Sequence, residues 1–155
     1  IKKFVSFEGT SILDLGCNSG GILLHLPEIS SGTGVDYDEN CINFARVCAD
    51  TLKYSCNYTF IKEDLNNIEI VNDYDIIFVL SLGSWVREWK KLYSMCVVCG
   101  KTIILETNND KEGKPQLELF KKLGCDITLI SGNSGDDTTG NYGRKTYLIV
   151  GGNTK

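Results

Sequence analysis

The chain has 155 residues, of which 42% are hydrophobic and 23% charged, values that are ordinary for a globular protein and exclude disordered and fibrous classes. Its formal net charge of -4 excludes the broadly basic surface that nonspecific nucleic-acid binding needs, so no DNA partner is expected. No apolar run is long enough to cross a bilayer, and no membrane partner is expected either.

One domain accounts for residues 1–155, because no linker, internal repeat or low-complexity segment divides the chain. The chain begins at Ile1 and not at a methionine, which leaves a truncated N-terminus open. Its seven cysteines are an odd number and lie mostly in apolar stretches, which predicts reduced thiols and a cytoplasmic protein. Cys96 and Cys99 have the CxxC spacing, but no second pair completes a zinc site, so no metal is expected. The sequence does not predict an oligomeric state.

Apolar strand-like runs alternate with helical patterns from Ser11 onward. This alternation predicts an α/β fold, doubly wound around a mostly parallel sheet with helices on both faces. Strands are predicted over residues 12–15, 34–37, 58–61, 74–80 and 102–105, with a turn over 31–34 before the second of them. The run over 74–80 is almost unbroken, which is typical of a strand covered on both faces.

One helix is expected before the second strand in the chain and another after it. The first begins near Ser19 or Gly20 and is short, because Pro27 discourages its continuation. Asp38 is expected to cap the second helix. Four side chains at helical spacing are expected to form the stripe of that helix that lies on the sheet: Cys41, Ala45, Cys48 and Leu52.

The third helix is expected to open at Gly83 and Ser84. Four side chains then share its apolar face: Trp85, Trp89, Leu92 and Cys96. This spacing favours a core position for both tryptophans over a ligand-binding one. Three basic residues are expected on the exposed face and are the first to test if the ligand is RNA: Arg87, Lys90 and Lys91.

The last third of the chain departs from the alternation. Pro115 is expected to begin a fourth helix that ends at Gly124. Residues 126–130 and 145–150 then have strand patterns and are joined by a polar loop without a helix. They predict an antiparallel C-terminal hairpin, which brings the sheet to seven strands.

Residues 11–21 combine an apolar strand with a glycine-rich turn and the start of a helix. The bare backbone and unpaired N–H groups of such a turn can approach a nucleotide-like ligand closely. Asp36 follows Asp14 by about 20 residues, at the end of the next strand, where its carboxylate can accept hydrogen bonds from both ribose hydroxyls. NAD and S-adenosylmethionine both fit these two features.

Asn18 distinguishes between NAD and S-adenosylmethionine as the ligand. A dinucleotide turn needs glycine at this position, because the pyrophosphate touches the backbone there, and a side chain crowds it. Asparagine still tolerates the left-handed conformation of the turn. Asp14 adds a negative charge that repels phosphate and suits the ammonium of an amino-acid group. The turn therefore favours S-adenosylmethionine.

At these residues the chain resembles the class I S-adenosylmethionine-dependent methyltransferases, and the resemblance covers most of its length. Residues 12–20 look like the family's first motif, 34–37 like the second, 63–65 like the third and 74–81 like the fourth-strand motif. The predicted hairpin strengthens the match, since the family's sheet ends with an antiparallel seventh strand inserted beside the sixth. The resemblance implies a cofactor site made of Asp14, Gly16, Cys17, Asn18, Gly20, Asp36, Tyr37, Asp64, Leu65, Leu80, Ser81 and Trp85.

The same resemblance implies a reaction in which S-adenosylmethionine gives its methyl group in line to an acceptor and leaves as S-adenosylhomocysteine. The acceptor is expected to be a small molecule or RNA. Glu106 and Ser81, at strand ends, are the candidate catalytic residues if the acceptor must lose a proton. Two alternatives stay open: an NAD(P)-dependent oxidoreductase, and a non-catalytic cofactor-binding subunit that acts through a partner.

Overall fold

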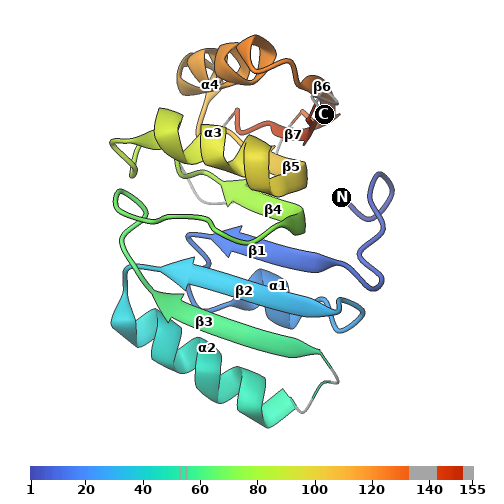
Figure 1. Cartoon of the computed structure of the whole chain (residues 1–155), viewed down its shortest axis with the longest axis vertical. Coiled ribbons are helices and arrows are strands. Elements are labelled where there is room, and N and C mark those ends of the chain that lie inside the picture. The colour runs from blue at the N-terminus through green and yellow to red at the C-terminus, as the bar shows by residue number, and fades with distance from the viewer. Residues whose placement is uncertain (53, 55, 133–142, 152–155) are drawn as a thin grey trace.

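Seven strands form one sheet in the order β3-β2-β1-β4-β5-β7-β6 (Figure 1). The computed structural model describes residues 1–52, 54, 56–132 and 143–151. The strands are β1 (Ser11–Leu15), β2 (Ser31–Asp36), β3 (Asn57–Lys62), β4 (Tyr74–Leu80), β5 (Gly100–Glu106), β6 (Asp126–Ser131) and β7 (Thr146–Val150). Strands β1 to β5 pair in parallel, and β7 pairs antiparallel with both β5 and β6. The predicted fold class is confirmed, including the C-terminal hairpin.

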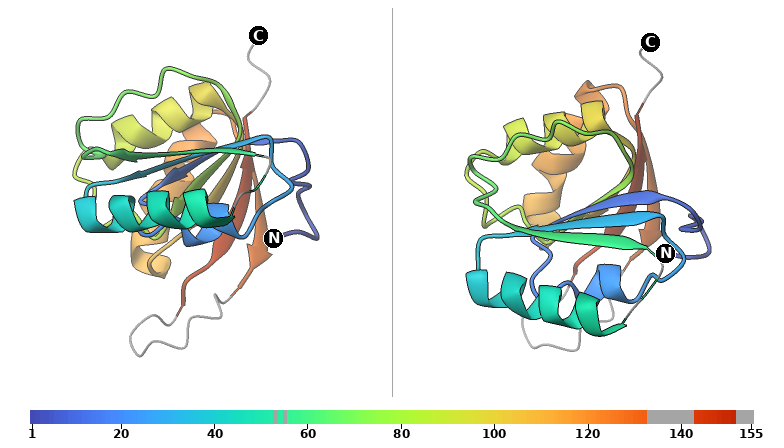
Figure 2. Two further views of the ribbon diagram at one scale, coloured as in Figure 1. Left: turned by 90° about the horizontal axis from the view of Figure 1, so that it is seen from below. Right: turned by 60° about the horizontal axis from the view of Figure 1, so that its bottom comes forward.

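Helices cover both faces of this sheet (Figure 2). They are α1 (Gly21–Leu24), α2 (Glu39–Leu52), α3 (Trp89–Cys99) and α4 (Asp110–Lys122). Side chains alternate along β1 between two buried clusters: Ile12 packs with residues of α1 and α2, while Leu13 and Leu15 pack with residues of α3 and α4. The period-2 alternation of the strand thus fills two separate cores with one run of apolar residues.

The sheet order places β1 between β2 and β4, so the chain leaves β1 in one direction and returns on its other side at β4. Connections diverge at such a switch point and open a crevice beyond the carboxyl ends of the strands. The residues that follow β1, β2 and β4 therefore meet at one edge of the sheet.

Strand β2 begins at Ser31, so the predicted turn over residues 31–34 is wrong. Its glycines serve close packing and not a turn. A Cβ atom at Gly34 would lie 2.7 Å from a ring atom of Phe60 and 2.8 Å from Cys17 Sγ. Glycine within a strand can mark such a close approach of neighbouring groups.

The buried stripe of α2 is centred on Ile42 and Ala45, which are fully buried. The predicted stripe is wrong at its end, because Leu52 is exposed. The cap is confirmed: Asp38 Oδ1 accepts a hydrogen bond of 2.8 Å from the backbone N–H of Asn40.

Helix α3 begins at Trp89 and not at Gly83 and Ser84. The backbone N–H groups of Trp85 and Val86 both donate to the Leu82 carbonyl, which makes a single turn ahead of the helix. Val86 enters the core in this turn and Trp85 points outward, so the predicted core position of Trp85 is wrong.

Helix α4 begins at Asp110, and Pro115 lies inside it, which corrects the predicted start at Pro115. Asn109 Oδ1 accepts a hydrogen bond of 2.9 Å from the N–H of Glu112 and caps the helix. The predicted end at Gly124 is confirmed, since this residue adopts φ 75° just after the helix.

No disulfide joins any cysteines among the described residues. No helix among the described residues is long and apolar enough to cross a membrane. Within the same residues, no group of three or more His, Cys, Asp or Glu side chains is placed to hold a metal ion.

Candidate active site

A pocket of about 940 Å³ opens at the carboxyl ends of β1, β2, β3 and β4. Its position is the one that the switch point between β1 and β4 dictates. The lining residues are Gly16, Asn18, Asp36, Tyr37, Lys62, Glu63, Asp64, Leu65, Asn66, Leu80, Ser81, Leu82, Trp85 and Val86.

The turn after β1 has a left-handed backbone at three positions: Gly16 with φ 73°, Asn18 with φ 50° and Gly20 with φ 75°. A Cβ atom at Gly16 would lie 2.5 Å from Leu82 Cδ2, so the backbone there faces the pocket without a side chain. Asn18 Oδ1 accepts a hydrogen bond of 2.7 Å from the N–H of Ser19, which fixes the unusual conformation of this residue.

Asp36, at the end of β2, ties the turn to the next strand. Its Oδ2 accepts a hydrogen bond of 2.8 Å from the Asn18 N–H, and its Oδ1 accepts one of 3.0 Å from the Asp38 N–H. Each carboxylate oxygen has a second lone pair, so Asp36 can still accept hydrogen bonds from a pair of vicinal hydroxyls. Tyr37 follows it on the pocket rim with 72% of its surface exposed, as a free aromatic face.

Asp14 lies beneath the turn and not in the pocket wall. It is only 2% exposed, and its Oδ2 has no hydrogen-bond partner among the described residues. Burial, followed by the nearby charge of Asp36, raises the pKa of Asp14 to about 7. A buried carboxyl with an unsatisfied oxygen is an acceptor for a cationic group or for a water that bridges to one.

Asp64 and Leu65 form the wall beyond β3. Asp64 Oδ1 accepts hydrogen bonds of 2.9 Å and 2.8 Å from the backbone and side-chain nitrogens of Asn66. These two bonds lower the pKa of Asp64, so it is ionised at neutral pH. Leu65 is buried beside it and offers an apolar surface to a flat ligand.

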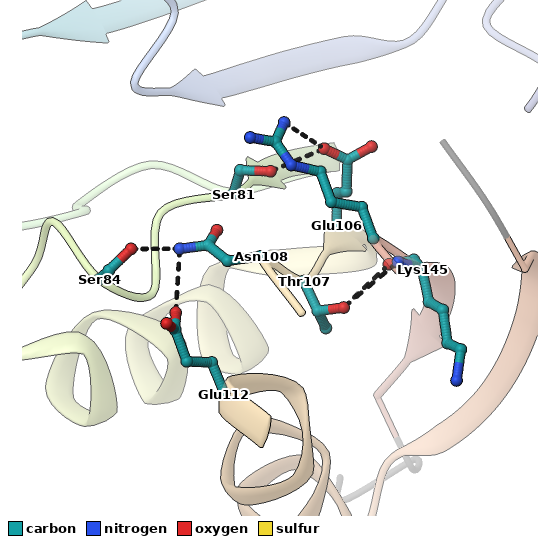
Figure 3. Close-up of polar contacts among 8 residues, drawn as sticks. Ser81, Ser84, Glu106, Thr107, Asn108, Glu112 and Lys145 are labelled. Atoms are coloured by element: carbon teal, nitrogen blue, oxygen red, sulfur yellow. Dashed lines mark hydrogen bonds and ion pairs between the residues drawn. The ribbon is translucent and has the colours of Figure 1, made fainter. Parts of the chain in front are cut away.

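Ser81, directly after β4, lines the pocket in a strained backbone conformation, and Figure 3 shows its contact with Glu106. Its φ of 56° is uncommon for a residue other than glycine and points to a constrained, often functional position. Ser81 Oγ donates a hydrogen bond of 2.7 Å to Glu106 Oε1, and the Ser81 N–H donates to the Glu106 carbonyl. Two bonds therefore fix Ser81 to the end of β5.

Glu106 is shared between Ser81 and a cation from the far end of the chain. Arg144 Nη1 lies 3.4 Å from Glu106 Oε1, and both side chains are about one-fifth exposed, 22% and 18%. Arg144 comes just before β7, which is inserted next to β5. The Thr107 N–H donates to the Lys145 carbonyl over 3.0 Å, and the Lys145 N–H donates to Thr107 Oγ1 over 3.3 Å, so the two strand ends are held together (Figure 3).

A second group of polar side chains lies near Ser81 and Glu106, where α4 starts (Figure 3). Asn108 Nδ2 donates to Ser84 Oγ and, over 3.0 Å, to Glu112 Oε2. The turn after β4 is thereby linked to the segment after β5, which fixes the backbone that carries Ser81 and Trp85.

Nine of the twelve residues in the predicted cofactor site line the pocket: Gly16, Asn18, Asp36, Tyr37, Asp64, Leu65, Leu80, Ser81 and Trp85. The other three, Asp14, Cys17 and Gly20, lie behind it and shape the turn. A Cβ atom at Gly20 would lie 2.6 Å from the Phe60 ring, so a side chain here would collide with β3. The predicted catalytic residue Glu106 is not in the pocket wall and meets it through Ser81.

Five lining residues are not among the predicted site residues, although Glu63 lies in the third motif: Lys62, Glu63, Asn66, Leu82 and Val86. Three of them, Lys62, Glu63 and Asn66, flank the predicted site residues Asp64 and Leu65. Their position at the end of a parallel strand could have indicated that they line the pocket. Leu82 and Val86 were not predicted, because the segment after β4 was interpreted as the start of a helix whose apolar face did not include them.

A family model described as a methyltransferase domain matches residues 6–112 of the chain. Among solved structures, a SAM-dependent methyltransferase from Aquifex aeolicus is 18% identical with a TM-score of 0.72, over 96% of this chain and 86% of that chain. Magnesium protoporphyrin IX methyltransferase from Synechocystis PCC 6803, solved with bound SAM, is 19% identical with a TM-score of 0.72, over 95% and 72%. The bifunctional kinase-methyltransferase WbdD is 20% identical with a TM-score of 0.72, over 92% of this chain.

The chain spans about a third of the length of the WbdD chains that it matches, 34% to 36%. At these identities the likeness to solved structures shows a shared fold. No curated protein sequence matches this chain.

Proposed function

The chain belongs to the methyltransferase domain family and has the class I methyltransferase fold, and we propose that its pocket binds S-adenosylmethionine for transfer of the methyl group to a small acceptor. The observation that carries the proposal is the joint position of the left-handed turn, Asp36 and Asp64 around one pocket. Family membership decides against the oxidoreductase alternative.

The residues present fit this cofactor at three points. The turn from Gly16 to Gly20 offers backbone where side chains would collide with Leu82 or Phe60. Asp36 keeps lone pairs for the ribose hydroxyls, and Tyr37 and Leu65 offer surfaces to the adenine ring. The unsatisfied oxygen of Asp14 suits the ammonium group, directly or through water. The structure from Synechocystis PCC 6803 contains SAM in a domain of the same fold.

When bound, S-adenosylmethionine supplies an electrophilic methyl group on its sulfonium. The protein holds the acceptor in line with that group and excludes water. Ser81 Oγ accepts a hydrogen bond from the acceptor's O–H or N–H, and it already donates its own hydrogen to Glu106 Oε1. A proton that leaves the acceptor is thus taken up at Ser81 Oγ as the Ser81 proton moves to Glu106.

RNA is a second candidate acceptor. Arg87, Lys90 and Lys91 are all exposed, and Arg87 directly follows the pocket residues Trp85 and Val86. Exposed cations in the segment that follows this part of the pocket wall favour a phosphate backbone as partner.

Isothermal calorimetry with S-adenosylmethionine, S-adenosylhomocysteine and NADH tests the cofactor. We expect both sulfur nucleosides to bind and NADH to give no heat, because Asn18 crowds a pyrophosphate. Binding of NADH without a response to either sulfur nucleoside would overturn the proposal.

Transfer of a labelled methyl group separates an enzyme from a cofactor-binding subunit. The purified chain is incubated with methyl-labelled S-adenosylmethionine and small-molecule or RNA extracts. Label incorporated by the chain alone supports catalysis, whereas incorporation only after a partner protein is added supports the subunit alternative.

A further inference from the structure

Trp85 is the most exposed aromatic side chain among the described residues, at 77%, and it stands on the rim of the pocket. The backbone beneath it is fixed, since the Trp85 N–H donates to the Leu82 carbonyl over 3.0 Å. The Arg87 N–H donates over 2.8 Å to Asn66 Oδ1, which anchors the far end of the same turn. Trp85 is therefore a large, exposed apolar side chain on a backbone turn that is anchored at both ends.

The pocket wall around Trp85 differs in character from the wall at β2 and β3. Three apolar side chains, Leu80, Leu82 and Val86, line it, and the last two are almost fully buried. The polar residue of this wall at the end of β4 is Ser81, whose hydroxyl donates a hydrogen bond to Glu106. This half offers a ring face, an aliphatic wall and one point for a hydrogen-bond donor of the ligand.

The charges of the pocket disfavour a polyanionic ligand. Its lining carries three carboxylates, Asp36, Glu63 and Asp64, against the single ammonium of Lys62. Phosphates that enter this space meet a net negative potential. A neutral or cationic ring instead gains from the face of an indole, which attracts both aromatic planes and cations.

We propose that Trp85 is the platform for the acceptor, and that the acceptor is an aromatic small molecule, neutral or cationic, that carries a hydroxyl or an amine. This assignment rests on the proposed function of the pocket. The acceptor's oxygen or nitrogen forms the new bond to the methyl carbon and gives its proton to Glu106 through Ser81 Oγ. The electron pair of the broken carbon–sulfur bond stays on sulfur, and S-adenosylhomocysteine leaves.

The test offers the protein methyl-labelled S-adenosylmethionine together with two sets of probes. The aromatic set contains tyramine, 4-methylcatechol and tryptamine. The contrasting set contains ethanolamine, glycerol 3-phosphate and a short oligoribonucleotide. We expect labelled product from at least one aromatic probe and none from the contrasting set.

Variants at the platform give the second measurement. Trp85→Ala should raise KM for the methylated aromatic probe by about tenfold, the scale of a lost stacking contact, while Trp85→Phe keeps KM within about threefold of the wild type. Phe44→Ala is the matched control, since it removes another exposed aromatic, from α2 and outside this pocket. Its KM should not change.

Three results would overturn the assignment of the acceptor and leave the cofactor proposal standing. They are methylation of a contrasting probe in place of the aromatic ones, no methylation of any aromatic probe by protein that binds S-adenosylmethionine, and an unchanged KM in Trp85→Ala. A protein that does not bind S-adenosylmethionine in calorimetry would overturn both proposals.

Discussion

The two halves of the pocket are built in different ways. The half at β1, β2 and β3 is made of short segments at the ends of successive strands, and each segment supplies its own group: the left-handed Asn18, the carboxylate of Asp36 and the carboxylate of Asp64. In the half at β4, Ser81 of the pocket wall contacts Glu106 through the pairing of β4 with β5, and Arg144 joins them only because β7 is inserted beside β5. Each group of the first half comes from a segment with its own local pattern, whereas the second half is defined by contacts between distant segments.

The largest expected effect is a loss of catalytic rate without a loss of cofactor affinity, from a change at Glu106. Glu106→Gln keeps the size of the side chain and an oxygen for Ser81, but it removes the base, so kcat should fall by about 100- to 10,000-fold. Affinity for S-adenosylmethionine should not change. Steady-state kinetics with the methylated acceptor and calorimetry make the comparison.

Glu118→Gln, on the exposed side of α4, is the control for loss of a carboxylate. A variant Glu106→Gln with normal kcat would show that the acceptor needs no base from this pair.

The next effect concerns the rigidity of the first half. Gly16→Ala forces a left-handed conformation on alanine and places its Cβ atom against Leu82, so the free energy of unfolding should fall by about 2 to 4 kcal/mol. Urea denaturation measures it.

Gly21→Ala is the matched control, since a Cβ atom at Gly21 meets nothing within 4 Å. Equal stability of the two variants would mean that the turn is not tightly packed.

Asp14 gives the first half a dependence on pH. Its pKa is raised to about 7 from an ordinary value of 3.8, so between pH 4 and 7 the folded state keeps a proton that the unfolded state has lost. Stability from this group is therefore complete at low pH and declines as pH rises toward 7. Asp14→Asn removes the decline and should raise the free energy of unfolding at pH 8 by about 2 kcal/mol.

Denaturation of wild type and Asp14→Asn at pH 5 and pH 8 makes this measurement. Asp126→Asn, exposed on β6, is the control. A wild-type stability that rises between pH 5 and pH 8, with no gain in the variant, would place the Asp14 carboxylate in a satisfied environment.

The difference between the halves also explains how far the sequence alone could predict the site. Strand β4 was predicted with its observed bounds, and Asp36 and Asp64 were placed at strand ends, because each signal lies within a few neighbouring residues. The link between Glu106 and Arg144 crosses 38 residues and depends on strand insertion, so no local pattern contains it.

Trp85 shows a second limit of sequence reasoning. Its spacing from Trp89 and Leu92 matches a helix face, yet Leu82 and Val86 fill the core from a single turn and leave Trp85 outside. Periodicity cannot decide between a turn and a first helical turn when both bury an apolar residue. The start of α4 was also predicted wrongly from a local pattern. Pro115 suggested the first helical residue, but Asn109 caps the helix earlier and Pro115 lies inside it.

The most direct test of the central claim is the affinity of S-adenosylmethionine for wild type and Asp36→Ala. We predict that Asp36→Ala binds about 5- to 150-fold more weakly, which corresponds to about 1 to 3 kcal/mol for hydrogen bonds to a charged group. Asp50→Ala, exposed on α2, should bind as the wild type does. An unchanged affinity in a folded Asp36→Ala would contradict the placement of the ribose at the end of β2.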